Sequence, residues 1–452
     1  MTPAPSAGYA LVRALTRMLL GLFYARIEVV GRERVPPSGG LIVAANHHNS
    51  IVDAMILMAT FERPLRVLAN APLFRHPLIG PFLRLVGGLP VHRRKEAGDD
   101  PQKNAALFAA TTAALRAGEA ILIFPEGRTQ PEPSLLPVRT GTARLLLAAE
   151  EGAPEGFRVT LLPVGLVFDR PGTFRAGRAL VRIGRPLETG GLADSAAPAR
   201  VLTQRLTEAL RGRIVEADDR DTLRLLKLAE EFWRDGGEVP APEPSEAARV
   251  EWLQRAMRGY RALQRTEPER VAAFRRELEA FDADAERAGL AAERLSRDYS
   301  AASVARYSAA EAFALLVGAP LALAGLLLHG IPYRLTAFAV KRIPHTDEEE
   351  ATDKIAAGLV LYPLCWALEG GAAFALGGGV GLAVFLLALP VTAFFALAWF
   401  ERFDGVRKEA AAFARFLGNR DLPRRLRERR RALVDELRAL ARLADAAPEG
   451  PR

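Results

Sequence analysis

Short apolar runs alternate with helical stretches over residues 30–190. We expect strands at 41–46, 65–70, 120–127, 159–168 and 179–187, and helices at 50–60, 102–117 and 140–150. Strands that alternate with helices predict an α/β domain with a central, largely parallel sheet flanked by helices. In such sheets the functional residues lie in the loops beyond the strand ends.

The sequence on either side of this domain, which we place at 31–195, has other patterns. Residues 1–30 predict an N-terminal amphipathic helix that lies on a membrane or on the domain, because arginines interrupt a short apolar run. Residues 196–305 predict a charged helical region, broken by the proline-rich stretch 239–244. Residues 404–452 predict a basic helical tail.

Three apolar segments lie within residues 306–403, at 309–329, 355–376 and 379–400. Each approaches the roughly 20 apolar residues that cross a bilayer, so we predict membrane segments. A buried soluble core is the weaker alternative, since little polar sequence is at hand to cover them. We expect the last two segments to form a hairpin at Gly377–Gly379, and the first, with Pro320 at its middle, to enter one leaflet without crossing.

Charge and cysteine usage narrow the class of protein. The formal net charge is +8, and its concentration in the tail after an apolar segment favours an anionic membrane surface over nucleic acid. The sequence has no zinc-finger spacing and no aromatic-basic RNA signature. Its one cysteine, Cys365, rules out an intrachain disulfide, which fits a catalytic region that faces a reducing cytoplasm.

A histidine pair and a carboxylate follow the first expected strand. His47 and His48 precede Ser50, a candidate helix N-cap, and Asp53 lies three residues further on. A neutral imidazole can take the proton of an attacking hydroxyl, and a carboxylate can fix its tautomer. Asp53 can equally be a helix cap and the histidines ordinary loop residues.

Three further groups of residues follow later strands. Arg93 and Arg94 end an apolar strand and could bind a phosphate, although this motif alone favours an ordinary surface arginine pair. Glu126 and Gly127 belong to the sequence FPEG after a buried strand, and Arg139 precedes the next expected helix. The sequence LPVG at 162–165 ends another strand.

Taken together, the sequences NHHNSIVD, GGLPVHR, FPEG and LPVG resemble the PlsC-like family of glycerol-3-phosphate and lysophosphatidate acyltransferases. All four blocks of that family occur here in order, over roughly residues 20–190. The resemblance implies an enzyme that moves a fatty acyl group from acyl-CoA or acyl carrier protein to a glycerol-phosphate hydroxyl. It implies no metal and no bound cofactor.

The resemblance also assigns roles to residues. It implies that a histidine of the first block is the general base and that Asp53 is the partner of this base. It also implies that Arg93 binds the acceptor's phosphate and that Glu126 and Gly127 line the same pocket. The usual spacing to the aspartate selects His48, whereas the Asn-His pair selects His47, which we favour. The family commonly has FPEGTR where this chain has FPEGRT, so a phosphate role is less secure for Arg128 than for Arg93.

The helical region and membrane segments are similar to a longer subgroup that includes fungal glycerol-3-phosphate acyltransferase-like proteins. This likeness favours glycerol-3-phosphate or dihydroxyacetone phosphate over lysophosphatidate as the acceptor. The arginine-rich tail and the cytoplasmic supply of acyl-CoA and glycerol phosphates predict an enzyme in the cytoplasmic membrane, with its catalytic domain facing the cytoplasm. The alternatives are a lyso-lipid acceptor without phosphate, a metal-dependent hydrolase using His47, His48, Asp53 and His92, and an inactive membrane scaffold. A serine hydrolase is not supported, because no G-x-S-x-G sequence is present.

Overall fold

The fold is that of a computed structural model, and its contacts divide the chain into two units. The first holds residues 1–223, 243–257 and 345–352, and the second holds the remainder. The structure describes residues 6–76, 79–92, 101–129, 132–169, 177–189, 195–235, 245–288, 301–342, 350–418 and 422–446.

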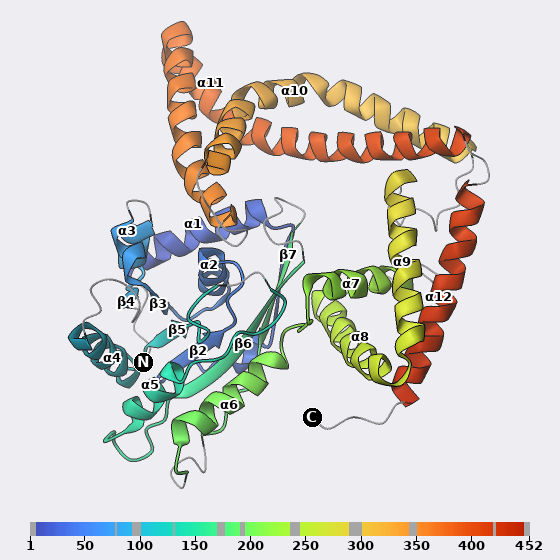
Figure 1. The fold of residues 1–452 in the computed structure, drawn as a ribbon. Coiled ribbons are helices and arrows are strands. Elements are labelled where there is room, and N and C mark those ends of the chain that lie inside the picture. Colours follow the sequence, from blue (N-terminus) through green and yellow to red (C-terminus); the bar gives the residue numbers. More distant parts are fainter. Residues whose placement is uncertain are drawn as a thin grey trace. The chain divides into compact units, whose positions relative to one another are not determined.

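The first unit is built on a seven-stranded sheet in the order β1-β7-β6-β2-β5-β3-β4 (Figure 1). All neighbouring strands are parallel except β6 and β7. The strands are β1 (Arg26–Val30), β2 (Leu41–Ala45), β3 (Leu65–Asn70), β4 (Leu89–Val91), β5 (Ala120–Ile123), β6 (Thr160–Asp169) and β7 (Arg178–Ile183). The predicted α/β fold with a largely parallel sheet is confirmed.

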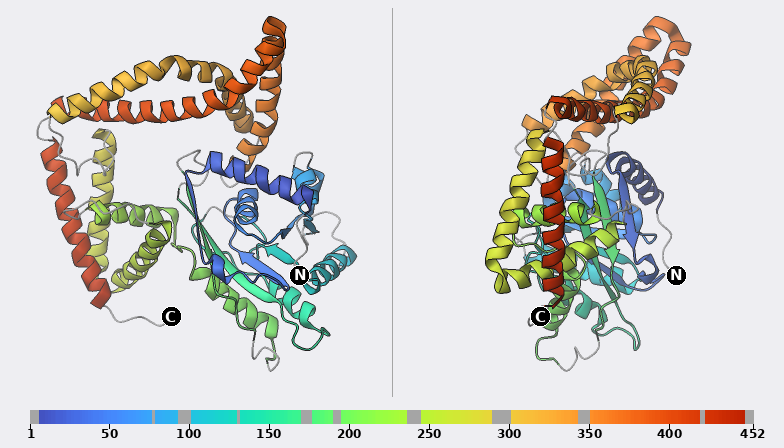
Figure 2. Two further views of the ribbon diagram at one scale, coloured as in Figure 1. Left: turned by 180° about the vertical axis from the view of Figure 1, so that it is seen from behind. Right: turned by 90° about the vertical axis from the view of Figure 1, so that its right-hand side faces the viewer.

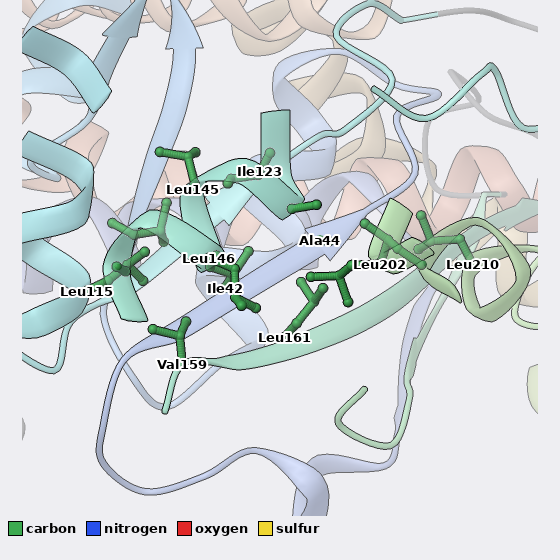
Figure 3. Close-up of a cluster of buried hydrophobic side chains, with 14 of the residues drawn as sticks. Ile42, Ala44, Leu115, Ile123, Leu145, Leu146, Val159, Leu161, Leu202 and Leu210 are labelled. Atoms are coloured by element: carbon green, nitrogen blue, oxygen red, sulfur yellow. The ribbon is translucent and has the colours of Figure 1, made fainter. Parts of the chain in front are cut away.

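Helices cover both faces of this sheet. They are α1 (Ala7–Phe23), α2 (Ile51–Thr60), α3 (Ile79–Leu85), α4 (Pro101–Arg116), α5 (Gly141–Glu150) and α6 (Pro198–Arg211), with 3-10 turns at Arg32–Arg34 and Ala71–Arg75. Strand β2 is fully buried along its length, as expected for a strand between two helical layers. On one face Ile42 and Ala44 meet leucines of α4, α5 and α6 in a continuous apolar cluster (Figure 3).

Two elements of this unit differ from the sequence interpretation. The N-terminal helix ends at Phe23, and residues 26–30, which we had placed in that helix, pair with β7 as an edge strand. Helix α6, expected in the separate charged region, places Leu202, Leu206 and Leu210 in the core of the sheet. Both differences arise because burial depends on partners that are distant in the sequence.

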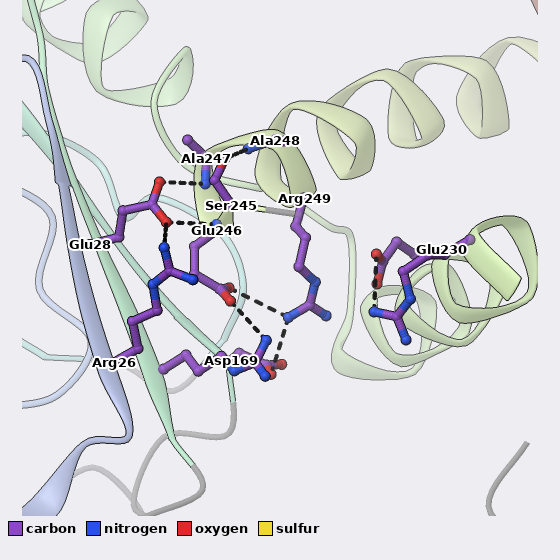
Figure 4. Close-up of polar contacts among 11 residues, drawn as sticks. Arg26, Glu28, Asp169, Glu230, Ser245, Glu246, Ala247, Ala248 and Arg249 are labelled. Atoms are coloured by element: carbon purple, nitrogen blue, oxygen red, sulfur yellow. Dashed lines mark hydrogen bonds and ion pairs between the residues drawn. The ribbon is translucent and has the colours of Figure 1, made fainter. Parts of the chain in front are cut away.

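Helix α8 (Glu246–Thr266) is tied to the edge of the sheet at its first turn. The Glu28 carboxylate on β1 accepts the backbone N–H groups of Glu246 (2.9 Å) and Ala247 (3.3 Å), as Figure 4 shows. A carboxylate at this position satisfies donors that have no partner within the helix, and it lies at the positive end of the helix dipole. Arg249 of the same turn pairs with Asp169 of β6 at 3.4 Å.

The second unit contains charged helices that pack through a narrow apolar seam. They are residues 224–235 of α7 (Arg220–Asp235), residues 258–266 of α8, and helices α9 (Pro268–Ala288) and α12 (Leu422–Ala446). Phe232 and Phe281 are fully buried and meet edge to face, with ring centroids 5.2 Å apart. Helices α9 and α12 lie side by side in all views (Figures 1 and 2), joined by Arg270–Glu436 at 2.6 Å and Arg429–Glu277 at 2.8 Å.

The same unit holds two long apolar helices, α10 (Ala301–Arg342) and α11 (Glu350–Gly418). Helix α11 is interrupted at Gly378, whose φ of 59° and ψ of −148° are not helical. Gly381 then lies against the carbonyl of Ala373, so the chain folds back at this glycine turn as a hairpin. Helix α10 continues through Pro320 and Pro332, and Gly325 brings it close to the carbonyl of Thr392.

Both apolar helices are long enough to cross a membrane. The stretches Glu311–Arg342 and Asp353–Arg407 reach mean hydropathies of 2.1 and 2.5, and 17% of the most apolar part of each is buried. Core helices of a soluble protein would be mostly buried. The two helices therefore suggest association with a membrane.

Candidate active site

The candidate site lies where two neighbouring parallel strands end. Ala44 of β2 is paired with Ile123 of β5, so the segments that follow them leave the sheet side by side. One segment is the loop Asn46–Ser50 and the other is the turn Phe124–Gly127. The sheet thus joins two sequence blocks that are 79 residues apart.

Asp53 is the centre of the first segment. It is fully buried in the first turn of α2, and its Oδ2 lies 2.9 Å from Nδ1 of His47. The same oxygen accepts the backbone N–H groups of His48 and Asn49, each at 2.8 Å. A carboxylate acceptor places the ring proton of His47 on Nδ1, which leaves Nε2 free of a proton and able to accept one.

The chain reaches this arrangement through a strained residue. Among the residues that the structure describes, Ser50 is the one non-glycine residue with positive φ (48°). Its side chain makes no N-cap hydrogen bond, although it occupies the N-cap position of α2. This turn lets His47, six residues before Asp53, reach the carboxylate, whereas His48 supplies its backbone N–H to Asp53.

The imidazole of His47 is also held by an aromatic ring. Phe124 follows β5 directly, and its ring is stacked on His47 with centroids 4.0 Å apart and planes 14° apart. The side chain of His47 remains 18% exposed. One ring face and one ring nitrogen are therefore occupied by protein, and part of the ring stays accessible.

Glu126 connects the two segments through backbone groups. It is only 2% exposed, and its Oε1 accepts the N–H of His47 at 2.7 Å while its Oε2 accepts the N–H of Leu136 at 2.9 Å. Burial raises the pKa of this carboxyl, and the two backbone N–H groups and the nearby histidines act against that rise. Both oxygens are thus used to hold the backbone at the site.

The structure describes two of the three arginines that were predicted to bind the substrate. Arg139 lies against Gly127, where φ is +72° and a Cβ atom would come within 3.1 Å of the Arg139 Nε. The N–H of Arg139 also donates to the carbonyl of Pro125 at 2.9 Å, so this arginine belongs to the same turn. Arg128 is exposed beside it. Arg93 lies outside the described residues.

Part of the chain is similar to known acyltransferases. The acyltransferase family matches residues 26–167, which include both segments. Residues 26–167 form a PlsC-like acyltransferase domain. The 1-acyl-sn-glycerol-3-phosphate acyltransferase of Borreliella burgdorferi is 31% identical over 119 residues, which cover 26% of this chain and 45% of that protein.

Two further proteins are similar to part of this chain. Glycerol-3-phosphate O-acyltransferase 2 of Saccharomyces cerevisiae is 32% identical over 144 residues, covering 30% of this chain and 19% of that protein. A crystal structure of the 1-acyl-sn-glycerophosphate acyltransferase PlsC from Thermotoga maritima is similar at 20% identity and a TM-score of 0.35, covering 45% of this chain and 77% of that chain. This chain spans less than half the length of the two curated relatives.

The acyltransferase domain contains supporting residues that the sequence interpretation missed. Asn46 is fully buried, and its side chain accepts the N–H of Leu166 (2.7 Å) and donates to the Leu166 carbonyl (2.9 Å), which extends the pairing of β2 with β6. Asn49 donates its side-chain amide to the buried hydroxyl of Tyr24 at 2.9 Å. Asn46 is the first residue of the sequence NHHNSIVD, so its position could be read from the sequence. Its partner Leu166, which is 120 residues away, could not.

The alternative of a metal-dependent hydrolase requires several ligands that meet at one place. In the described ranges, no group of three or more His, Cys, Asp and Glu side chains is placed to hold a metal ion. His47 and Asp53 face one another, and His92 belongs to the segment that follows β4.

Proposed function

We propose that this chain transfers a fatty acyl group from a thioester donor, acyl-CoA or acyl carrier protein, to a hydroxyl of a glycerol-phosphate acceptor. The observation that carries this proposal is the His47–Asp53 pair at the end of β2, within an acyltransferase domain. The named relatives act on glycerol-3-phosphate and its 1-acyl derivative, which indicates the class of acceptor.

The pair supports direct transfer with His47 as the general base. Nε2 of His47 takes the proton of the acceptor hydroxyl while the hydroxyl oxygen attacks the thioester carbonyl. The buried carboxylate of Asp53 stabilises the imidazolium that forms. When the tetrahedral intermediate collapses, the C–S bond breaks and the imidazolium returns its proton to the leaving sulfur. The products are an ester and a free thiol, and no covalent enzyme intermediate is needed.

The acceptor's phosphate requires a cation near this pair. We assign that role first to Arg93, with Arg128 and Arg139 beside the Phe124–Gly127 turn as further candidates, because guanidinium groups bind phosphate with two parallel hydrogen bonds. Glu126 is unsuited to a direct phosphate contact, since an ionised carboxylate repels a phosphate and both its oxygens accept backbone N–H groups. We propose that Glu126 and Gly127 shape the pocket through the backbone.

The apolar helices indicate where the enzyme acts. Helices α10 and α11 are long and apolar enough to hold the chain in a membrane, where acyl-lipid products accumulate. We propose that the acyltransferase domain lies on the cytoplasmic side of that membrane, where acyl-CoA, carrier protein and glycerol phosphates are found.

The test is an acceptor panel. The full chain, purified in detergent, is incubated with labelled acyl-CoA or acyl carrier protein and with glycerol-3-phosphate, dihydroxyacetone phosphate, lysophosphatidate or lysophosphatidylcholine. We expect transfer to at least one acceptor that carries a phosphate monoester, and a rate lower by about 10² to 10⁴ in a His47→Ala variant. Transfer only to lysophosphatidylcholine would support the alternative of an acceptor without a phosphate monoester. No transfer to any acceptor from either donor would support an inactive membrane scaffold.

A further inference from the structure

We infer that Phe124 is a positioning residue for His47: its ring fixes the plane of the imidazole and stabilises the protonated form of that ring. This inference rests on the proposed function, because it concerns the residue that we assign as the general base. The stack of the two rings, with centroids 4.0 Å apart and planes only 14° apart, is the observation behind it.

Two contacts together define the orientation of the His47 ring. The hydrogen bond from Nδ1 to Asp53, 2.9 Å long, fixes one edge but still permits rotation about the line that joins the two groups. A flat ring against one face removes that rotation. The backbone of His47 is fixed as well, because its N–H donates to Glu126 at 2.7 Å.

Phe124 can serve as a support because its own backbone is held rigidly. It follows Ile123, which is buried and paired with Ala44 of the neighbouring strand. Its carbonyl accepts the N–H of Gly127 at 3.1 Å, which closes the turn behind it. Phe124 therefore follows β5 and His47 follows the neighbouring strand β2, so the pairing of these strands sets the distance between the two rings.

The stack also has an electrostatic consequence. The face of an aromatic ring is electron-rich and attracts a cation, and His47 becomes a cation only after it has taken the acceptor's proton. An interaction that strengthens as the transition state forms raises kcat and leaves substrate binding unchanged. Titratable groups beside His47 in the described structure include Asp53 from α2, Glu126 from the turn after β5 and the adjacent His48. We expect these groups to stay in place when Phe124 is replaced, because their hydrogen bonds do not involve its side chain.

The experiment compares Phe124→Leu and Phe124→Met, which remove the ring, with Phe124→Tyr, which keeps it. Phe157→Leu is the matched control, because Phe157 is a partly buried phenylalanine against the apolar core of the same sheet. The full chain in detergent is assayed with the donor and acceptor that it accepts. We measure kcat, KM for both substrates and the pH profile of kcat, and we compare melting temperatures.

We expect kcat to fall roughly threefold to thirtyfold in Phe124→Leu and Phe124→Met, the range expected for loss of a cation–π contact. KM for both substrates should stay within about twofold. The acid limb of the kcat profile should move to lower pH, because the imidazolium is less stable without the aromatic face. Phe124→Tyr and Phe157→Leu should retain the kcat and the profile of the parent chain.

Parental kcat and an unmoved acid limb in both ring-deleted variants would overturn the inference. So would equal losses in Phe157→Leu, or a kcat loss explained by lower melting temperature, since either would show a purely structural role. A His47→Ala variant separates this inference from the proposed function. If His47→Ala is inactive while Phe124→Leu behaves like the parent chain, the base assignment stands and only the role of Phe124 fails.

Discussion

At the residue scale, one carboxylate oxygen of Asp53 accepts three hydrogen bonds. The His47 ring and the backbone N–H groups of His48 and Asn49 all bond to Oδ2, within 2.8–2.9 Å. The carboxylate therefore orients the imidazole and holds the loop that carries it. All three donors precede α2, which begins at Ile51, so these bonds hold the loop and the ring and do not cap the helix.

The two histidines should respond differently to substitution. His47→Ala removes the ring that Asp53 orients, and we expect acyl transfer to fall by about 10² to 10⁴. His48→Ala keeps the backbone N–H that Asp53 uses, so most of the activity should remain. Initial rates of acyl transfer by purified variants with matched melting curves check this. Equal, mild losses would show that neither ring is the base.

Removing the Asp53 carboxylate should abolish transfer as well. In Asp53→Ala the imidazole loses the acceptor that fixes its tautomer, a defect that costs up to about 10⁴ in kcat in comparable triads. The variant must be shown to fold, by its melting curve and its elution volume. A folded Asp53→Ala protein with full activity would contradict the mechanism.

Glu126 should make stability depend on pH. Burial raises the pKa of this carboxyl above its ordinary value of 4.5, so the folded chain holds the proton more tightly than the unfolded chain. Between 4.5 and the raised folded value, the unfolded chain binds fewer protons, and the free energy of unfolding falls as pH rises. Below that window the contribution is fully present.

Glu126→Gln removes this titration. We expect the melting temperature of the variant to depend less steeply on pH above about 4.5 than that of the parent chain, in detergent at constant ionic strength. The amide keeps one acceptor oxygen for two backbone N–H groups, so activity should also fall. An unchanged slope would show that Glu126 titrates alike in the folded and unfolded chains.

At the element scale, α1 presents apolar side chains on two faces. Tyr9, Val12 and Leu20 are buried, whereas Leu11 and Met18 are 67% and 62% exposed. Leu85 of α3 is also exposed, and its side chain lies within 3 Å of where a Cβ on Gly8 would stand. Adjacent exposed apolar side chains of this size are typical of a surface that contacts another phase.

This face of α1 should therefore contact lipid. Single cysteines at Leu11 or Met18, in a Cys365→Ser background, are labelled with a fluorophore after reconstitution into nanodiscs. We expect brominated lipids to quench both labels and to leave a label at Arg32, an exposed residue of the 3-10 turn after β1, unquenched. Equal quenching at all three positions, or none at residues 11 and 18, would contradict membrane contact through this face.

At the scale of the whole molecule, the number of membrane crossings decides where the charged parts lie. The turn at Gly378 makes the two halves of α11 a hairpin, which returns the chain to its starting side if both halves cross. Helix α10 contains Pro320 and Pro332, and it bends along its length (Figure 1). If α10 enters one leaflet without crossing, the acyltransferase domain and the arginine-rich α12 share the cytoplasmic side, as the positive-inside rule favours.

Cysteine accessibility tests that topology. Lys341→Cys and Arg431→Cys, each in the Cys365→Ser background, lie on exposed positions of α10 and α12. We expect an impermeant thiol reagent to label neither in sealed cells and both after permeabilisation. Labelling of either position from outside would show that α10 crosses the membrane or that the orientation is reversed.

The sequence by itself determined the elements and the chemistry of single blocks. Short apolar runs predicted the positions of five strands to within a few residues, namely β2, β3, β5, β6 and β7. Such runs are a clear signal because strands that are buried on both faces consist almost entirely of apolar residues. The four blocks also identified the acyltransferase domain, and the glycine triplet located the turn in α11. Each of these signals is carried by neighbouring residues.

Only the tertiary structure decided which groups meet. Helical spacing alone puts residues 47 and 53 on different faces, and the positive φ of Ser50 is what brings them together. The sequence predicted that Glu126 lines the acceptor's pocket, but the bond from the His47 backbone to its carboxylate is visible only in the structure. The sequence assigned no role to Phe124, whose ring stacks on the imidazole of His47. The physical reason is that strand register joins segments 79 residues apart, and no local pattern records that pairing.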